Sequence, residues 1–118
     1  MSKRILVVDD EPDIVEVVRL RLEANNYEVI AAYDGEEGLR KARNEQPDLI
    51  ILDILMPEMD GYTFVRELKA DESIKDIPIV VLTAKDKMRD LFAIEGIKDY
   101  IVKPFKGEEL VKIIGKYL

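Results

Sequence analysis

Three aspartates stand at points where apolar runs of the sequence end. Asp9 and Asp10 follow Ile5–Val8, and Asp53 follows Leu49–Leu52. Carboxylates in such positions can bind a hard cation, take a proton or attack as nucleophiles. Acids also end strands simply because they need water, so each aspartate by itself has an ordinary structural explanation.

A hydroxyl and an ammonium group occupy comparable positions further along the chain. Thr83 follows Ile79–Leu82, and Lys103 follows Tyr100–Val102. Taken singly, they are explained as a strand threonine and a solvated charge. The sequence contains neither histidine nor cysteine, which excludes a histidine-based triad, thiolate or imidazole metal sites, and disulfides. Any chemistry must therefore use carboxylates, hydroxyls and lysines.

The elements that must position these residues alternate regularly along the chain. Apolar runs of strand type and amphipathic segments of helical period follow one another five times. The expected strands are Arg4–Val8, Tyr27–Ala32, Leu49–Leu52, Ile79–Thr83 and Asp99–Lys103. The expected helices are 12–25, 35–44, 61–70, 86–95 and a last one lined by Leu110, Ile113, Ile114 and Tyr117.

This alternation predicts an α/β fold with a parallel sheet and helices on both faces. The first, third and fourth strands are the most apolar, so they belong in the middle of the sheet. Tyr27–Val29 and Asp99–Tyr100 combine polar and apolar residues, which suits the edge strands of the sheet. A flavodoxin-like order 2-1-3-4-5 satisfies this pattern, and 118 residues suffice for one domain.

In that order all five polar residues reach the carboxyl edge of the sheet, where ligands bind in such folds. Asp9, Asp10 and Asp53 would repel one another, and Lys103 alone does not neutralise them. Mg²⁺ would, because it accepts few protein ligands and several waters. Asp53 could then form an aspartyl-phosphate whose oxygens contact Mg²⁺, Lys103 and the Thr83 hydroxyl.

The composition limits the kinds of partner and the cellular compartment that we expect for this protein. The net charge is −7 with a pI near 4.7, and no cluster of Lys or Arg stands out, so we expect no direct nucleic-acid binding. The longest apolar stretch, Ile77–Ala84, is far short of the roughly 18 residues of a membrane span. We expect a cytoplasmic protein with no membrane contact.

Four motifs, in order, carry a resemblance to a known family. They are Val-Val-Asp-Asp-Glu-Pro at 7–12, Leu-Asp-Ile-Leu-Met-Pro-Glu-Met-Asp-Gly at 52–61, Leu-Thr-Ala at 82–84 and Tyr-Ile-Val-Lys-Pro-Phe at 100–105. From residue 1 to 118 the chain resembles the receiver domain of two-component response regulators. The resemblance implies signal transduction by a phosphorelay, with the flavodoxin-like fold expected above.

The resemblance also implies roles for individual residues. Asp53 would be the phosphoacceptor, and Mg²⁺ would be bound by Asp10, Asp53 and the backbone carbonyl of Leu55, with Asp9 acting through water. Lys103 and Thr83 would contact the phosphoryl group. The Lys103–Pro104 peptide would be cis.

A conformational switch is implied as well. Thr83 would move toward the phosphoryl group and Tyr100 would turn inward, altering the face made by the fourth helix, the fifth strand and the last helix. The ordinary alternative for Tyr100 is an edge-strand aromatic. The segment from Thr83 to Gly96 is about two residues shorter than the family pattern, which bears on this face rather than on the phosphorylation chemistry.

The expected partners follow from the missing histidine. The phosphoryl group would come from a histidine kinase or phosphotransfer protein, and the output partner or domain is unspecified. We expect a switch that promotes its own phosphorylation and dephosphorylation, not a turnover enzyme. A rival Mg²⁺-dependent phosphatase would show Asp-x-Asp after the first strand and a cap insertion. An unphosphorylatable interaction domain would lack one of the five site residues, and a nucleotide-binding module would need a glycine-rich loop.

Overall fold

The computed structural model describes residues 2–53, 61–84 and 96–118. The predicted helix at 86–95, Leu55 and most of the shortened segment lie outside these ranges. Within them the elements are β1 (Arg4–Val8), α1 (Pro12–Glu23), β2 (Glu28–Ala32), α2 (Gly35–Glu45), β3 (Leu49–Asp53), α3 (Gly61–Lys69), β4 (Ile79–Ala84), β5 (Asp99–Lys103) and α4 (Gly107–Tyr117).

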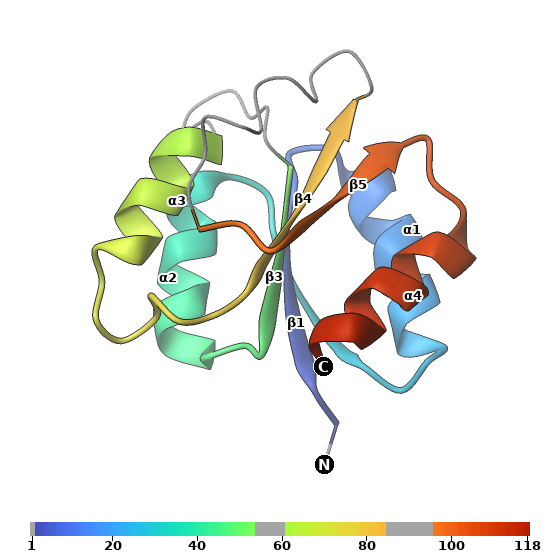
Figure 1. Cartoon of the computed structure of the whole chain (residues 1–118), viewed down its shortest axis with the longest axis horizontal. Coiled ribbons are helices and arrows are strands. Elements are labelled where there is room, and N and C mark those ends of the chain that lie inside the picture. Colours follow the sequence, from blue (N-terminus) through green and yellow to red (C-terminus); the bar gives the residue numbers. More distant parts are fainter. Residues whose placement is uncertain (1, 54–60, 85–95) are drawn as a thin grey trace.

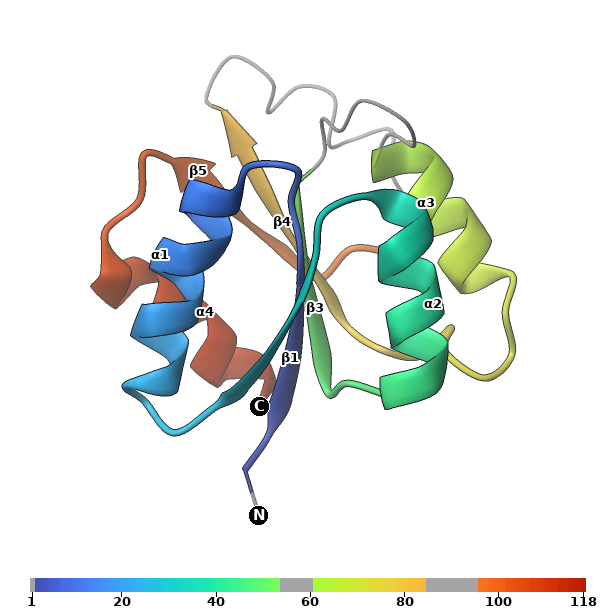
Figure 2. The ribbon, with the colours of Figure 1, turned by 180° about the vertical axis from the view of Figure 1, so that it is seen from behind.

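All five strands are parallel and lie in the order β2-β1-β3-β4-β5. Figure 1 shows the sheet between two helical layers, with α2 and α3 on one side and α1 and α4 on the other, and Figure 2 shows the same layers from behind. The predicted flavodoxin-like fold and strand order are confirmed.

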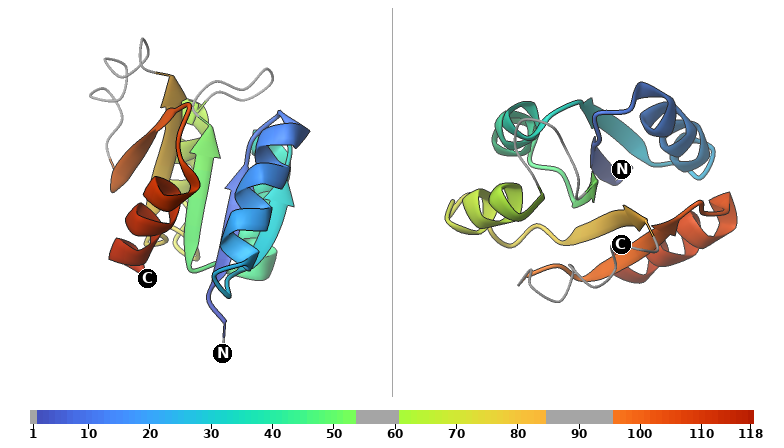
Figure 3. Two further views of the ribbon diagram at one scale, coloured as in Figure 1. Left: turned by 90° about the vertical axis from the view of Figure 1, so that its right-hand side faces the viewer. Right: turned by 90° about the horizontal axis from the view of Figure 1, so that it is seen from above.

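Strand side chains alternate between two apolar cores, one on each face of the sheet. Leu6, Ile50 and Val81 pack with α2 and α3, around Phe64. Their neighbours in sequence point the other way, into a second core with residues of α1 and α4. The view from above in Figure 3 shows the helices on both faces. Strands covered on both faces explain the unbroken apolar runs.

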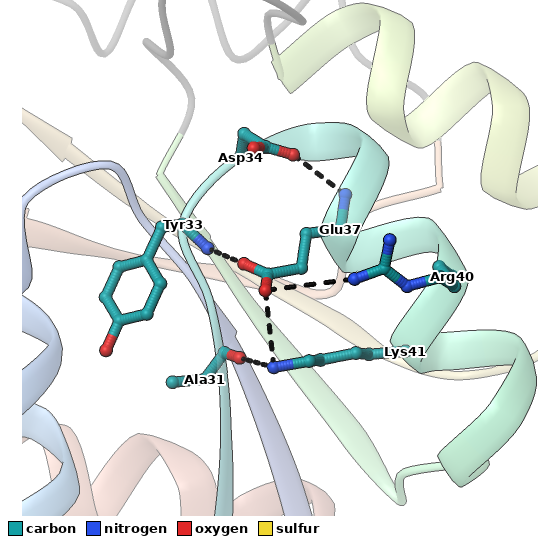
Figure 4. Close-up of polar contacts among 6 residues, drawn as sticks. All are labelled: Ala31, Tyr33, Asp34, Glu37, Arg40 and Lys41. Atoms are coloured by element: carbon teal, nitrogen blue, oxygen red, sulfur yellow. Dashed lines mark hydrogen bonds and ion pairs between the residues drawn. The ribbon is translucent and has the colours of Figure 1, made fainter.

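The helix ends follow from local chemistry. In α2 the N-cap Asp34 accepts a hydrogen bond from the Glu37 backbone N–H at 2.8 Å, and Glu37 Oε1 accepts one from the Tyr33 N–H at 2.6 Å (Figure 4). Two otherwise unpaired donors are thereby satisfied. Gln46, with a left-handed φ of 47°, ends the helix. The predicted helix at 35–44 therefore extends by one residue.

The edge strand β2 differs from the central strand β3 in its burial and in its contacts. Every residue of β3 is buried, whereas β2 begins exposed. Lys41 Nζ donates to the Ala31 carbonyl of β2 at 2.6 Å and lies 3.5 Å from Glu37 Oε2 (Figure 4). A lysine placed in this way occupies a backbone acceptor of the edge strand.

Two further expectations concern the backbone and the membrane. The Lys103–Pro104 peptide is cis, as the family resemblance implies. Among residues 2–53, 61–84 and 96–118, no helix has the length and apolar character to cross a membrane.

Candidate functional site at the carboxyl edge of the sheet

Strand register brings the polar residues to one edge. Val8 pairs with Leu52, so Asp9 emerges beside Asp53, the last residue of β3. Asp53 in turn pairs with Leu82, which places Thr83 one residue further along β4. Lys103, the last residue of β5, pairs with Ala84. The regular parallel register alone therefore collects side chains from four strand ends.

Lys103 spans the cluster with its ammonium group. Its Nζ lies 3.4 Å from Asp53 Oδ2, 3.6 Å from Asp9 Oδ2 and 3.9 Å from Glu11 Oε1. The carboxylates of Asp9 and Asp53 are almost entirely buried. One cation thus bridges two buried acids and a third at the rim, where water screens little of the attraction.

Asp9 is the acid with the strongest perturbation. The pKa of its carboxyl group is raised to about 6, chiefly by burial and in addition by the neighbouring Asp53, while the Glu11 backbone N–H and Lys103 act in the opposite direction. That N–H donates to Oδ1 at 3.0 Å. Oδ2 is buried and accepts no hydrogen bond within the described residues. A cation could satisfy this oxygen.

The acidic cluster has four members. Ligand oxygens of Asp9, Asp10, Glu11 and Asp53 all lie within 4.8 Å of one another. If all four ionise, Lys103 balances one charge and three remain. The hard oxygen donors, the surplus charge and the unsatisfied Asp9 oxygen together fit Mg²⁺.

Glu11 was not among the residues predicted for the site. It is exposed and precedes Pro12 as the N-cap residue of α1, without a side-chain capping bond. The signal available in the sequence was its adjacency to Asp10. The other predicted metal ligand, the Leu55 carbonyl, lies outside the described residues.

The remaining predicted residues lie on β4 and β5. Thr83 is buried at the end of β4. Tyr100 pairs with Val81 in β5 and is 40% exposed, so its ring is open to solvent in this structure. Asp9, Asp53 and Lys103 are thus in mutual contact range, Asp10 lies in the acid cluster, and Tyr100 stands three residues from Lys103 along the same strand.

This fold and this edge define a class of protein. The family model of the response regulator receiver domain matches residues 5–115. The chain therefore belongs to the response regulator receiver family.

Individual relatives agree with this assignment. Over 112 residues the chain is 46% identical to the alkaline phosphatase synthesis transcriptional regulatory protein PhoP of Bacillus subtilis. The match covers 93% of this chain and 46% of that protein. The chemotaxis response regulator CheY4 of Vibrio cholerae superposes with a TM-score of 0.91 at 36% identity and full coverage of both chains.

A third relative is a receiver domain with a bound metal ion. The receiver domain of the sensor histidine kinase PA1611 from Pseudomonas aeruginosa has a TM-score of 0.90 and 35% identity, covering 99% of this chain and 98% of that one. It is described with a magnesium ion coordinated in the active site cleft. The chain spans about half the length of the curated transcriptional regulators it matches.

Proposed function

We propose that this receiver domain, expected to span residues 1–118, accepts a phosphoryl group on Asp53 and thereby switches a signalling surface. The observation that carries the proposal is the Lys103 ammonium group, which reaches both Asp53 and Asp9 from a different strand. A lysine at this distance could neutralise an oxygen of a phosphoryl group attached to Asp53. The same lysine holds the nucleophile in place beforehand.

The transfer step uses the Asp53 carboxylate as the nucleophile. One carboxylate oxygen attacks phosphorus, the phosphorus–nitrogen bond of a phosphohistidine donor breaks, and the imidazole nitrogen keeps the electron pair and takes a proton. A mixed anhydride forms on Asp53. The 118 residues contain no histidine, so the donor lies outside them, in a histidine kinase or phosphotransfer protein. Attack by water later reverses the modification.

Asp9, Asp10 and Asp53 would hold Mg²⁺, with Glu11 at the rim and the Leu55 carbonyl as an expected further ligand. When bound, the ion supplies neutralising charge to the phosphoryl oxygens. Asp9 orients the cluster through its bond from the Glu11 N–H. Asp53 presents its oxygen, and Lys103 holds that oxygen in place.

Thr83 and Tyr100 would report the modification. Thr83 is buried beside Asp53 on the neighbouring strand, within reach of a group added there. Tyr100 is exposed and would turn inward when Thr83 moves, changing the face that contains β5 and α4. Such a change is a two-state equilibrium biased by new charge and new acceptor oxygens.

The donor would dock against an apolar groove between α1 and the segment that follows Lys103. The groove is lined by Val17, Leu20, Arg21, Ala24, Phe105 and Gly107. Val17 and Leu20 are 56% and 60% exposed, although both are large apolar residues. α1 begins directly after the acidic cluster, and Phe105 follows Lys103 by two residues, so both segments that line the groove lead directly from the site. Leu20→Asp should slow transfer from a phosphohistidine protein and leave transfer from acetyl phosphate unchanged.

A reaction of this kind makes the protein a switch rather than a turnover enzyme. We expect it to act in the cytoplasm. Receiver domains in general are signalling modules. A protein that modifies only its own Asp53 releases no product from an external substrate apart from the spent donor. The switched face would act on an output partner or output domain, and we expect no direct nucleic-acid binding by residues 1–118.

Incubation with Mg²⁺ and acetyl phosphate tests the proposal directly. The intact mass should rise by one phosphoryl group, and the increase should disappear without Mg²⁺. Asp53→Asn should abolish it, because the amide nitrogen is no nucleophile at neutral pH. Asp13→Asn, which changes an exposed acid in the first turn of α1, serves as the matched control and should be modified as the unaltered protein is.

Two results would contradict the proposal. Phosphorylation that persists in Asp53→Asn would place the acceptor elsewhere. Phosphorylation that is indifferent to Lys103→Met would remove the role of the ammonium group, for which we expect a loss of about tenfold or more in rate.

A further inference from the structure

A second polar cluster lies at the opposite end of β5, away from the acids. Asp99, the first residue of the strand, accepts a hydrogen bond through Oδ2 from the Tyr117 hydroxyl at 2.9 Å. The same oxygen lies 3.6 Å from Lys116 Nζ. Tyr117 and Lys116 belong to the last turn of α4. The carboxylate therefore joins the start of the strand to the end of the C-terminal helix.

The phenol makes a second contact to the same stretch of backbone. Its oxygen lies 3.2 Å from the Lys98 carbonyl. A hydroxyl has one proton, and the shorter, charge-assisted bond to Asp99 is the stronger of the two. The other Asp99 oxygen accepts from the Tyr100 backbone N–H at 2.8 Å. Asp99 therefore contacts the backbone of the residue expected to switch.

The position of this cluster lets it affect how easily β5 opens. β5 is an edge strand, paired only with β4 in the described sheet, and edge strands are the part of a sheet that opens most easily. Lys103 ties its far end to Asp53 and Asp9. From Asp99 to Lys103 the strand spans roughly 13 Å at the usual rise per residue. Both ends of one short strand are thus tied by carboxylate contacts.

We propose that Tyr117 and Asp99 form a latch that fixes β5 lengthwise, setting the position of Lys103 at the site and coupling it to α4. The coupling rests on the function proposed above, whereas the latch itself does not. Tyr117 is a positioning residue, since it contacts none of the reacting atoms. A charge added at Asp53 pulls on Lys103 at one end of β5, and the latch resists at the other.

Tyr117→Phe removes the hydroxyl and keeps the ring, which packs against the apolar core beneath α4. Amide hydrogen exchange in β5 should accelerate by at least about tenfold, because a bond to a charged group is lost at an edge strand. Exchange in β1 and β3 should stay the same. Tyr27→Phe is the matched control, because Tyr27 packs against the same core and lies next to β2 at the other edge.

A functional readout separates positioning from general loosening. Tyr117→Phe should slow phosphorylation by acetyl phosphate about threefold to tenfold through misplacement of Lys103. Mg²⁺ affinity should change less than this rate, because the acids that would hold the ion lie on other strands. Asp99→Asn should act similarly, and the double variant should be no worse than either single variant, as expected of two residues that act as a unit.

Three outcomes would overturn the proposal. They are exchange that accelerates evenly over the whole sheet, an effect of Tyr27→Phe equal to that of Tyr117→Phe, and a phosphorylation rate that stays unaltered despite faster exchange in β5. Absence of phosphorylation in the unaltered protein would refute the proposed function instead. The exchange pattern would still decide whether the latch exists.

Discussion

Asp9 is the most buried acid of the cluster, and within the described residues its buried Oδ2 accepts no hydrogen bond. Burial and the nearby Asp53 disfavour its ionised form, which the pKa of about 6 expresses. At neutral pH the metal-free protein therefore keeps a buried charge that lowers its stability. A buried charge that lowers stability in this way is typical of a site suited to binding a cation.

Asp9→Asn should therefore stabilise the metal-free protein. The pKa of about 6 lies well above the ordinary 3.8, so the gain should be on the order of 1 to 3 kcal/mol at pH 7. Urea unfolding in the presence of EDTA measures it. Asp13→Asn, at an exposed position, should change the free energy of unfolding by less than about 0.5 kcal/mol. A destabilised Asp9→Asn variant would contradict this account.

The pH dependence of that gain follows from the same group. Because the folded-state pKa of Asp9 lies above the unfolded value of 3.8, the folded protein binds more protons between these two pH values. This contribution to stability is therefore full below about pH 4 and is lost as the pH rises to about 6. The difference in unfolding free energy between Asp9→Asn and the unaltered protein should grow across this window and then level off. A difference independent of pH would locate the strain elsewhere.

At the scale of elements, Gly38 allows α2 to pack closely against the sheet and α3. A Cβ atom built there would lie 2.9 Å from Phe64 Cε2 and 3.0 Å from Val8 Cγ2, so α2 reaches β1 and α3 only because this residue has no side chain. Gly115 in α4 offers the opposite case, with no atom within 4 Å of an added Cβ.

These two glycines give a matched pair of substitutions. Gly38→Ala should destabilise by about 1 to 3 kcal/mol, because overpacking against a fully buried phenyl ring outweighs the gain in helix propensity. Gly115→Ala should stabilise by roughly 0.5 kcal/mol, since only the propensity changes. Thermal unfolding of both variants measures the signs. Equal signs would mean that α2 can shift outward and relieve the contact.

The strands and their order were predictable because their signals are local and cumulative. β3 is continuously apolar since both of its faces are covered, and five alternating units leave few topologies. Boundaries moved by one or two residues, as in α1, which ends at Glu23 with Ala24 as its C-cap. Nothing in the sequence distinguishes a helix residue that continues the last turn from one that caps it.

The site was predictable to the extent that register determines it. Asp9, Asp53 and Lys103 come together because each lies at the end of a strand of one parallel sheet or directly after it. Glu11 was missed because it belongs to the loop after β1, and strand register does not determine where a loop side chain points. The Asp99–Tyr117 contact was missed for a related reason, since it depends on where the last turn of α4 lies relative to the start of β5.

At the scale of the whole molecule, Mg²⁺ should act as a stabilising ligand of the folded state alone. Asp9 and Asp10 are contributed from the end of β1 and Asp53 from β3, 43 residues further along from Asp10, so the unfolded chain has no comparable site. At a hundredfold excess over its Kd, the ion should add about 2.7 kcal/mol to the free energy of unfolding. The melting temperature should rise continuously with Mg²⁺ concentration and return to its starting value with EDTA.

Variants of the acidic cluster test whether Mg²⁺ stabilises the protein by binding there. Asp10→Asn should remove most of the Mg²⁺-dependent rise, whereas Asp13→Asn should retain it in full. Asp9→Asn should begin from a higher metal-free stability and gain less from Mg²⁺, because its substitution relieves the repulsion that the ion would otherwise neutralise. An equal gain in all three variants would mean that Mg²⁺ stabilises through general screening and that the acidic cluster is not its site.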